Sequence, residues 1–223
     1  MTRPTDQLPK VVEVSIASDA RQVRGELRVP HDASGVVAFA HGSGSGRYSP
    51  RNRFVAQELR RLRLATLLVD LLEEDEAKER DKVFDIGLLA VRLLAAARWL
   101  RAEELTRSLA IGYFGASTGA AAALSAAAEA PELVAAVVSR GGRPDLAARA
   151  LARVKAPTLL IVGAKDEQVL DWNRDAYGQL QAEKELVVIP GASHLFEESG
   201  TLEEVARHAA RWFVRHLGSG APR

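Results

Sequence analysis

The sequence predicts an α/β fold: a three-layer sandwich in which helices cover both faces of one mostly parallel sheet. Short, continuously apolar runs, typical of strands buried on both faces, alternate along the chain with longer segments of helical pattern. This alternation repeats often enough to predict βαβ units. The 223 residues show no internal repeat, low-complexity linker or composition break. We therefore expect one domain over residues 1–223, with flexible ends at about 1–10 and 218–223.

The expected elements follow in order, beginning with a hairpin. Residues 11–17 and 23–29 alternate apolar and polar side chains, which is typical of half-exposed strands, and the SDARQ segment joins them. The apolar runs predict further strands at 35–40, 65–70, 108–114, 133–139, 157–163 and 184–190. The helical pattern predicts helices at about 50–63, 81–104, 117–130, 144–152, 168–182 and 201–217. Ser49 and Ser117 suit helix starts, whereas Pro131 and Pro157 lie where helices should already have ended.

Composition excludes several classes of protein. Thirty Lys and Arg residues against 29 Asp and Glu leave a net charge of +1, so no global field predicts nucleic acid as a partner. The absence of cysteine excludes disulfides, thiolate nucleophiles, Cys-ligated zinc and iron–sulfur clusters. No stretch approaches the roughly 20 apolar residues of a membrane span, and the first ten residues hold no signal-peptide run. We expect a soluble, cytoplasmic protein without a membrane partner.

Ser117 is the candidate nucleophile. In such a sheet, chemistry collects where strands end and loops lead into helices. Residues 115–119 read GASTG, the G-x-S-x-G pattern of a nucleophile elbow, and they fall between a predicted strand and an Ala-rich helix. The alternative is a turn of small residues that lets the helix pack close to the sheet. The position at a strand-to-helix junction favours the elbow, because the helix N-terminus would then face a developing oxyanion.

His194 and Asp166 are the candidate base and orienting acid. A serine hydroxyl needs a base, and His194 lies in a short loop directly after the last predicted strand. Asp166 follows the strand before it by three residues, with Glu167 and Asp171 as nearby rivals. The order Ser117, Asp166, His194, each in a loop after a strand, is the order found in α/β-hydrolases. A loop carboxylate or histidine alone would carry little weight; the agreement of order and placement carries the assignment.

The glycine-rich segment 41–46, HGSGSG, has two interpretations. A loop of this kind between strand and helix can cradle a phosphate, but neither Rossmann spacing nor a P-loop lysine is present. As an oxyanion loop the segment fits well. The backbone N–H of Ser43, or of a neighbour, would join that of Thr118.

Together these residues resemble the α/β-hydrolase superfamily, and within it the dienelactone-hydrolase-like group of small hydrolases without a lid. The resemblance runs over nearly the whole chain, from HGSGSG through GASTG and GAKD to GASH. It implies an eight-stranded, mostly parallel sheet whose second strand is antiparallel. It also implies Ser117 as nucleophile, His194 as base, Asp166 as orienting acid, and backbone amides of Ser43 and Thr118 as the oxyanion hole. Dienelactone hydrolases proper use a cysteine nucleophile, which this chain lacks, so their substrate does not carry over.

The substrate site is expected to be open. Only the seventeen residues 140–156 separate two predicted strands where related hydrolases insert a cap, so no cap domain fits. Arginines crowd the first loop and its helix. Arg47, or Arg140 or Arg143, could hold a substrate carboxylate. The alternative is a solvated helix face that the acidic run 73–76 offsets.

The sequence thus predicts a serine hydrolase that cleaves small carboxylic esters or related acyl compounds in two steps. No metal or organic cofactor is expected, because no cluster of His and carboxylate residues has ligand spacing. The expected partner is a small ester-type molecule, and the protein is expected to be a monomer or homodimer. Two alternatives remain open: an acyltransferase or perhydrolase with the same triad, and an inactive hydrolase-fold binding protein.

Overall fold

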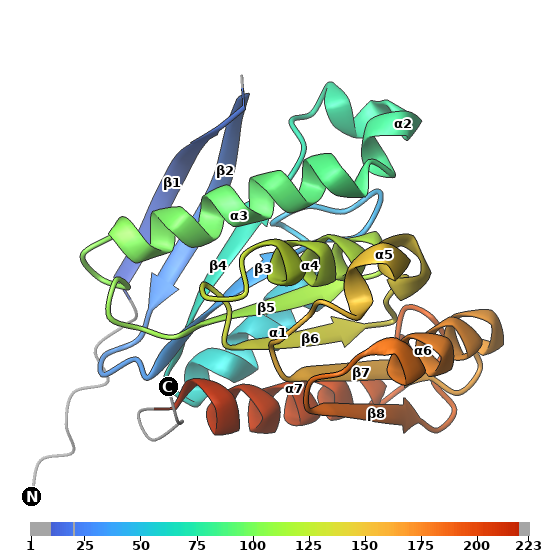
Figure 1. Cartoon of the computed structure of the whole chain (residues 1–223). Coiled ribbons are helices and arrows are strands. Elements are labelled where there is room, and N and C mark those ends of the chain that lie inside the picture. Colours follow the sequence, from blue (N-terminus) through green and yellow to red (C-terminus); the bar gives the residue numbers. More distant parts are fainter. Residues whose placement is uncertain (1–9, 20, 219–223) are drawn as a thin grey trace, which may run out of the picture.

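A single eight-stranded sheet runs through the computed structural model, which describes residues 10–19 and 21–218 (Figure 1). The strand order is β1-β2-β4-β3-β5-β6-β7-β8. The strands are β1 (Lys10–Ser18), β2 (Arg21–Val29), β3 (Gly35–Ala40), β4 (Leu64–Asp70), β5 (Ile111–Ala116), β6 (Ala136–Arg140), β7 (Thr158–Gly163) and β8 (Lys184–Ile189). β2 is antiparallel to both of its neighbours, and every other neighbouring pair is parallel. The predicted mostly parallel sheet with an antiparallel second strand is confirmed.

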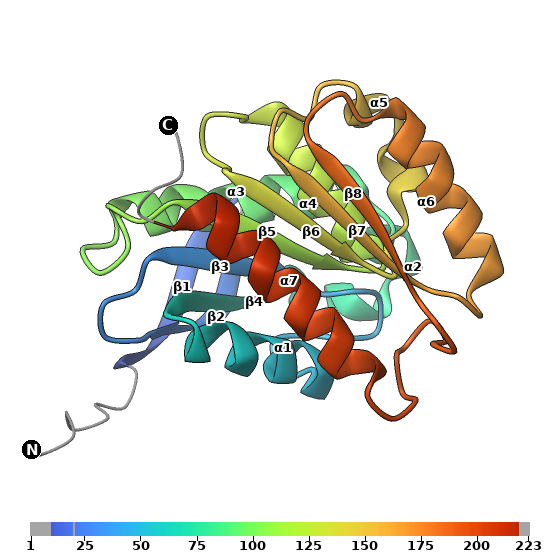
Figure 2. The same ribbon diagram turned by 90° about the horizontal axis from the view of Figure 1, so that it is seen from below.

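Helices cover both faces of this sheet. They are α1 (Pro50–Arg61), α2 (Arg80–Val83), α3 (Ile86–Ala102), α4 (Thr118–Glu129), α5 (Ala148–Leu151), α6 (Glu167–Gln179) and α7 (Thr201–Leu217), with short 3-10 turns at Glu76–Lys78 and Pro144–Ala147. Seen from below, α1 and α7 lie side by side in front of the sheet, and α3 and α4 lie behind it (Figure 2). The three-layer sandwich predicted from the alternation of apolar runs is therefore confirmed.

The core has two halves because each central strand is buried on both faces. All six residues of β3 are buried. Val36, Ala38 and Ala40 belong to the cluster beneath α3 and α4, whereas Val37 and Phe39 belong to the cluster beneath α1 and α7. This assignment follows the two-residue period of a strand, which sends successive side chains to opposite faces.

Two predicted helices differ in detail from those of the structure. The helix expected over 81–104 is wrong as a single element: α2 ends at Val83, and α3 begins after Asp85, whose carboxylate accepts a hydrogen bond from the Leu88 N–H. An N-cap of this kind starts a helix whatever pattern precedes it. The helix expected over 144–152 begins instead with a 3-10 turn. The flexible ends expected at 1–10 and 218–223 fall outside the described residues, except for Lys10 and Gly218.

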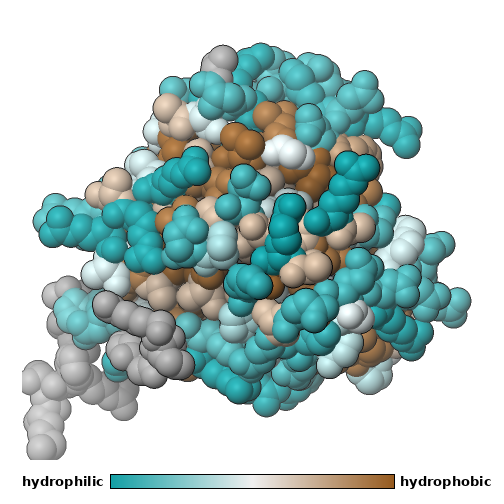
Figure 3. Space-filling model, viewed as in Figure 1, coloured by the Kyte–Doolittle hydropathy of each residue, from teal (hydrophilic) through white to brown (hydrophobic). Residues whose placement is uncertain are grey.

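The face formed by β1 and α3 carries an open cleft of about 540 Å³. It is lined by Ile16, Ala17, Ser18, Asp19, Val91, Ala95, Arg98 and Trp99. Figure 3 shows this side of the molecule, with apolar surface in brown between polar side chains in teal. None of the candidate catalytic residues lines this cleft. Among the described helices, none is long and apolar enough to cross a membrane.

Candidate active site

Ser117 lies at a sharp turn between β5 and α4, as the elbow pattern predicts. Its backbone has φ 52° and ψ −120°, a positive φ that costs a serine free energy and therefore has to be imposed by its neighbours. The Ser117 N–H donates to the carbonyl of Arg140 at 3.2 Å, and its carbonyl accepts from the Arg143 N–H at 3.1 Å. The end of β6 and the loop after it thus hold this turn from one side.

Glycines at both ends of the elbow let the backbone pack closely. A Cβ on Gly119 would lie 2.2 Å from the Ala40 carbonyl oxygen and 2.4 Å from that of His41. A Cβ on Gly115 would lie 2.4 Å from the Ala120 Cα. Both distances are far below van der Waals contact, so the G-x-S-x-G spacing serves close packing as well as the turn.

His194 and Asp166 face each other across two neighbouring loops. His194 Nδ1 lies 2.5 Å from Asp166 Oδ2, and the two side chains are 38% and 15% exposed. Asp166 follows β7 and His194 follows β8. Gly163 allows the loops to approach, because a Cβ there would lie 2.4 Å from the Ala192 carbonyl oxygen. With Nδ1 donating to the carboxylate, Nε2 of His194 is left as the basic nitrogen.

The loop after β6 brings His194 towards the elbow. Gly141, which follows Arg140, has φ 50°, and a Cβ built on it would lie 3.3 Å from the His194 carbonyl oxygen and 3.6 Å from its Cε1. No hydrogen bond joins the Ser117 hydroxyl to His194 among the described residues. In enzymes without substrate such bonds are often long and tighten only in the complex.

The segment 41–49, here called the glycine-rich loop, lies beside the elbow. A Cβ on Gly42 would lie 3.0 Å from both the Ala116 carbonyl oxygen and the Ser117 Cβ. Among the described residues, neither the Ser43 N–H nor the Thr118 N–H has an acceptor. An oxyanion hole requires free N–H donors close to the serine; Thr118 follows Ser117 directly, and Ser43 follows Gly42 in the loop that contacts Ser117.

His41 is a buried residue of this loop for which no role was expected. Its Nε2 lies 3.0 Å from the Leu71 N, which donates to it, and its Nδ1 lies 3.0 Å from the Gly42 carbonyl oxygen. Burial lowers the pKa of His41, so the ring is neutral at physiological pH, donates from Nδ1 and accepts at Nε2. The signal in the sequence was its place at the end of an apolar strand, directly before glycine.

The three arginines considered from the sequence have different surroundings. Arg47 pairs with Asp70, and Arg143 pairs with Asp145 at 2.7 Å while its guanidinium lies 4.1 Å from the centre of the Trp172 ring. Arg140 is only 7% exposed, and its guanidinium has no hydrogen-bond or ion-pair partner among the described residues. Burial lowers its pKa to about 10, with a further contribution from Arg51.

Arg140, the last residue of β6, therefore remains cationic at neutral pH, at the carboxyl edge of the sheet and with its charge uncompensated. Its guanidinium lies 5.8 Å from the centre of the Phe196 ring, two residues beyond His194. The alternative interpretation, in which the acidic run 73–76 offsets the arginines of α1, is wrong. The ion pairs of that run are instead with Arg21, Lys82 and Arg92.

A metal centre finds no support in the described part of the chain, where no three His, Asp or Glu side chains are grouped as a metal ion would require. The loops at the carboxyl ends of β3, β5, β7 and β8 instead gather a strained serine, a histidine–aspartate pair and two free N–H donors. This set can carry out acyl transfer by a serine nucleophile.

Comparisons by sequence family and by structure both match this chain to the same family. The family model of the dienelactone hydrolase family matches residues 69–217. A crystal structure of dienelactone hydrolase from Anabaena variabilis is 56% identical, with a TM-score of 0.92, and the match covers 95% of this chain and 100% of that chain. Est1E from Butyrivibrio proteoclasticus shares the fold at 17% identity, with a TM-score of 0.77 over 92% of this chain and 98% of that one.

Two proteins from strains of Mycobacterium tuberculosis, named as candidate phosphoribosyl transferases, are 53% identical over 210 residues. The match covers 94% of this chain and 47% of theirs. The chain therefore spans about half the length of the curated relatives it matches.

Proposed function

This chain belongs to the dienelactone hydrolase family, and from that premise we propose that it is a serine hydrolase that cleaves small carboxylic esters through an acyl-enzyme on Ser117. The observation that carries the proposal is the hydrogen bond of 2.5 Å between His194 Nδ1 and Asp166 Oδ2, beside a serine with φ 52°. A histidine oriented by a carboxylate next to a strained serine is the arrangement that activates a hydroxyl.

The reaction would take place in two steps. His194 Nε2 takes the Ser117 proton as the serine oxygen attacks the ester carbonyl, and the tetrahedral intermediate collapses when His194 returns that proton to the leaving alcohol. A water molecule, deprotonated by the same nitrogen, then attacks the acyl-enzyme, and His194 returns that proton to the Ser117 oxygen as the acid is released. Asp166 stabilises the imidazolium formed in each step, and the N–H groups of Ser43 and Thr118 donate to the oxyanion.

We further propose that the acyl compound carries a carboxylate, held by an arginine at the catalytic edge. The sequence left Arg47, Arg140 and Arg143 as candidates. Arg47 and Arg143 each already face a carboxylate of this chain, which supports Arg140 as the group with the most to gain from an anionic substrate.

Phosphoribosyl transfer, the activity in the name of the longer relatives, is not part of this proposal. That name belongs to whole proteins of which this chain matches 47%. Transfer to an acceptor other than water keeps the same triad. Product analysis with added alcohol or hydrogen peroxide would show esters or peracids if an acyltransferase or perhydrolase activity dominated.

The direct test is the intact mass of the protein after treatment with a fluorophosphonate. We expect one adduct on the parent and none on Ser117→Ala, because only an activated serine reacts. Ser125→Ala, which removes another hydroxyl at α4, is the matched control and should keep the adduct. A folded parent without an adduct would contradict the proposal and favour a binding protein with the hydrolase fold.

A further inference from the structure

A continuous chain of hydrogen bonds leads from a buried ion pair to the glycine-rich loop. Arg92, in the middle of α3, donates from Nη1 to the Leu71 carbonyl oxygen at 2.8 Å. The Leu71 N–H donates to His41 Nε2 at 3.0 Å, and His41 Nδ1 donates to the Gly42 carbonyl at 3.0 Å. Three hydrogen bonds thus connect α3 to Gly42, the elbow's neighbour, through the backbone of one residue, Leu71, and the ring of His41.

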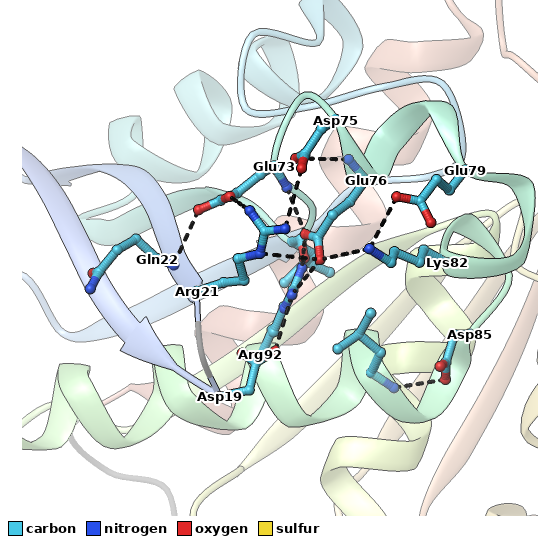
Figure 4. Close-up of polar contacts among 12 residues, drawn as sticks. Asp19, Arg21, Gln22, Glu73, Asp75, Glu76, Glu79, Lys82, Asp85 and Arg92 are labelled. Carbon is cyan, nitrogen blue, oxygen red and sulfur yellow. Dashed lines mark hydrogen bonds and ion pairs between the residues drawn. The ribbon is translucent and has the colours of Figure 1, made fainter.

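The origin of this chain is rigidly held. Arg92 and Glu76 form a two-pronged pair, with Nη1 2.5 Å from one carboxylate oxygen and Nη2 2.9 Å from the other, and their side chains are 2% and 3% exposed. Figure 4 shows the pair at the centre of a cluster to which Asp19, Arg21 and Lys82 also contribute. A guanidinium held at both nitrogens in a buried site has little freedom, which fixes the third bond to Leu71.

The far end of the glycine-rich loop is tied to the same strand end. The Asp70 carboxylate accepts a hydrogen bond from the Arg47 N–H at 2.6 Å and pairs with the Arg47 guanidinium. Residues 70 and 71, at the end of β4, thus hold the loop at two points, one on each side of Ser43. At Arg47 the loop is anchored by an ion pair that is partly exposed, whereas at His41 it is anchored by buried groups.

We propose that Arg92, together with Glu76, is a positioning residue for the oxyanion hole, acting on the Ser43 N–H through the backbone of Leu71 and the His41 ring. The inference rests on the proposed function, because it assumes that Ser43 faces an oxyanion formed on Ser117. Oxyanion donors accelerate a reaction only if they are already aimed at the position where charge develops. If the loop has to be reordered in each turnover, the enzyme's kcat falls while its affinity for the substrate is unchanged.

The test uses a double variant, Arg92→Met with Glu76→Gln. Removing both charges avoids leaving one of them buried and unpaired, and such replacements often leave a fold as stable as before. Asp19→Asn is the matched control. It removes a carboxylate that Arg92 Nη2 contacts at 3.1 Å but leaves the bonds to Glu76 and Leu71, and asparagine suits the φ of 48° at that position.

For ester hydrolysis we expect kcat of the double variant to fall about tenfold with KM within about twofold of the parent, since the loop is loosened but its donors are retained. The control should keep both constants within about twofold. Thermal unfolding of each variant, measured in parallel, confirms that the assays are made on folded protein.

A second readout is independent of activity. Amide hydrogen exchange followed by NMR should be at least about tenfold faster at Leu71 in the double variant than in the parent and the control. The His41 ring should also lose its single tautomer, which ring ¹⁵N shifts report. A parent without Ser117-dependent activity would overturn the proposed function. The exchange data would still show whether Arg92 and Glu76 hold the Leu71 backbone and the His41 ring in place.

A double variant with the kcat of the parent would overturn the positioning role. So would unchanged exchange at Leu71, or a loss of activity in Asp19→Asn equal to that of the double variant.

Discussion

At the scale of single residues, two residues near the elbow are held in unfavourable conditions by their surroundings: Ser117 in a strained backbone conformation and Arg140 as a buried charge. Ser117 keeps a positive φ because its N–H and carbonyl are bound by Arg140 and Arg143 and because glycines flank it. Arg140 keeps a charge in a place where burial opposes it. Strain and uncompensated charge both cost stability, and proteins tend to retain such costs where they serve function.

The first prediction concerns Arg140. Replacing it by glutamine should raise KM for an ester that carries a carboxylate by about tenfold or more, since a charge-assisted pair is lost, while KM for a neutral ester of the same size stays unchanged. Steady-state kinetics on the two esters measure the difference. Arg143→Gln, which removes an arginine already paired with Asp145, is the control and should leave both KM values unchanged. An equal rise of KM for both esters in the Arg140 variant would contradict the assignment of a carboxylate site.

At the scale of elements, the buried pair of Arg92 and Glu76 joins α3 to the 3-10 turn after β4. The hydrogen bond from Arg92 lowers the pKa of Glu76 to about 2, from an ordinary value near 4.5. Because the folded state lowers this pKa, the stabilisation is fully present above the unfolded pKa and is lost as pH falls from about 4.5 towards 2.

The second prediction is therefore a pH dependence. The free energy of unfolding of the parent should fall towards that of Glu76→Gln as pH drops from about 4.5 to about 2, by up to about 3 kcal/mol. Urea unfolding of both proteins across this pH range measures the difference between their free energies of unfolding. The contributions of the other carboxylates are common to both proteins and cancel in that difference. A constant gap between the two curves would show that the ion pair does not contribute in this way.

At the scale of the whole molecule, the described part of the chain holds no cap domain over the candidate active site. The connection between β6 and β7 holds only the turn Pro144–Ala147 and α5, so there is no cap domain over the carboxyl edge of the sheet. In a closed hydrophobic pocket each methylene is worth roughly 1–3 kcal/mol of discrimination, whereas an open edge offers little surface to contact an added methylene.

The third prediction follows from this openness. Values of kcat/KM for p-nitrophenyl acetate, butyrate and octanoate should lie within about tenfold of one another. Initial rates on the three esters, below the concentration at which octanoate forms micelles, provide the measurement. A preference of a hundredfold or more for one chain length would mean that the loops form a closed acyl pocket.

The parts of the molecule that were predictable from sequence are those with local signals. Apolar/polar alternation located β1 and β2, continuous apolar runs located the other six strands, and the G-x-S-x-G pattern located the turn at Ser117, because these are patterns of neighbouring residues. The break before α3 was missed, since a single cap at Asp85 outweighed a long helical pattern. The contacts of His41 and Arg92 were also missed. Their partners lie 30 and 16 residues away, and no local pattern reports a contact over such a separation.

The short β6–β7 connection also bears on how such a protein can change. It crosses the catalytic edge beside His194 and Ser117 but contributes no strand, so its length is free to vary without altering sheet register. An insertion between residues 143 and 153 would place new chain over the candidate site while leaving Ser117, His194 and Asp166 on unchanged supports. Under the proposed function, selectivity could then be acquired separately from chemistry, by a change in this segment alone.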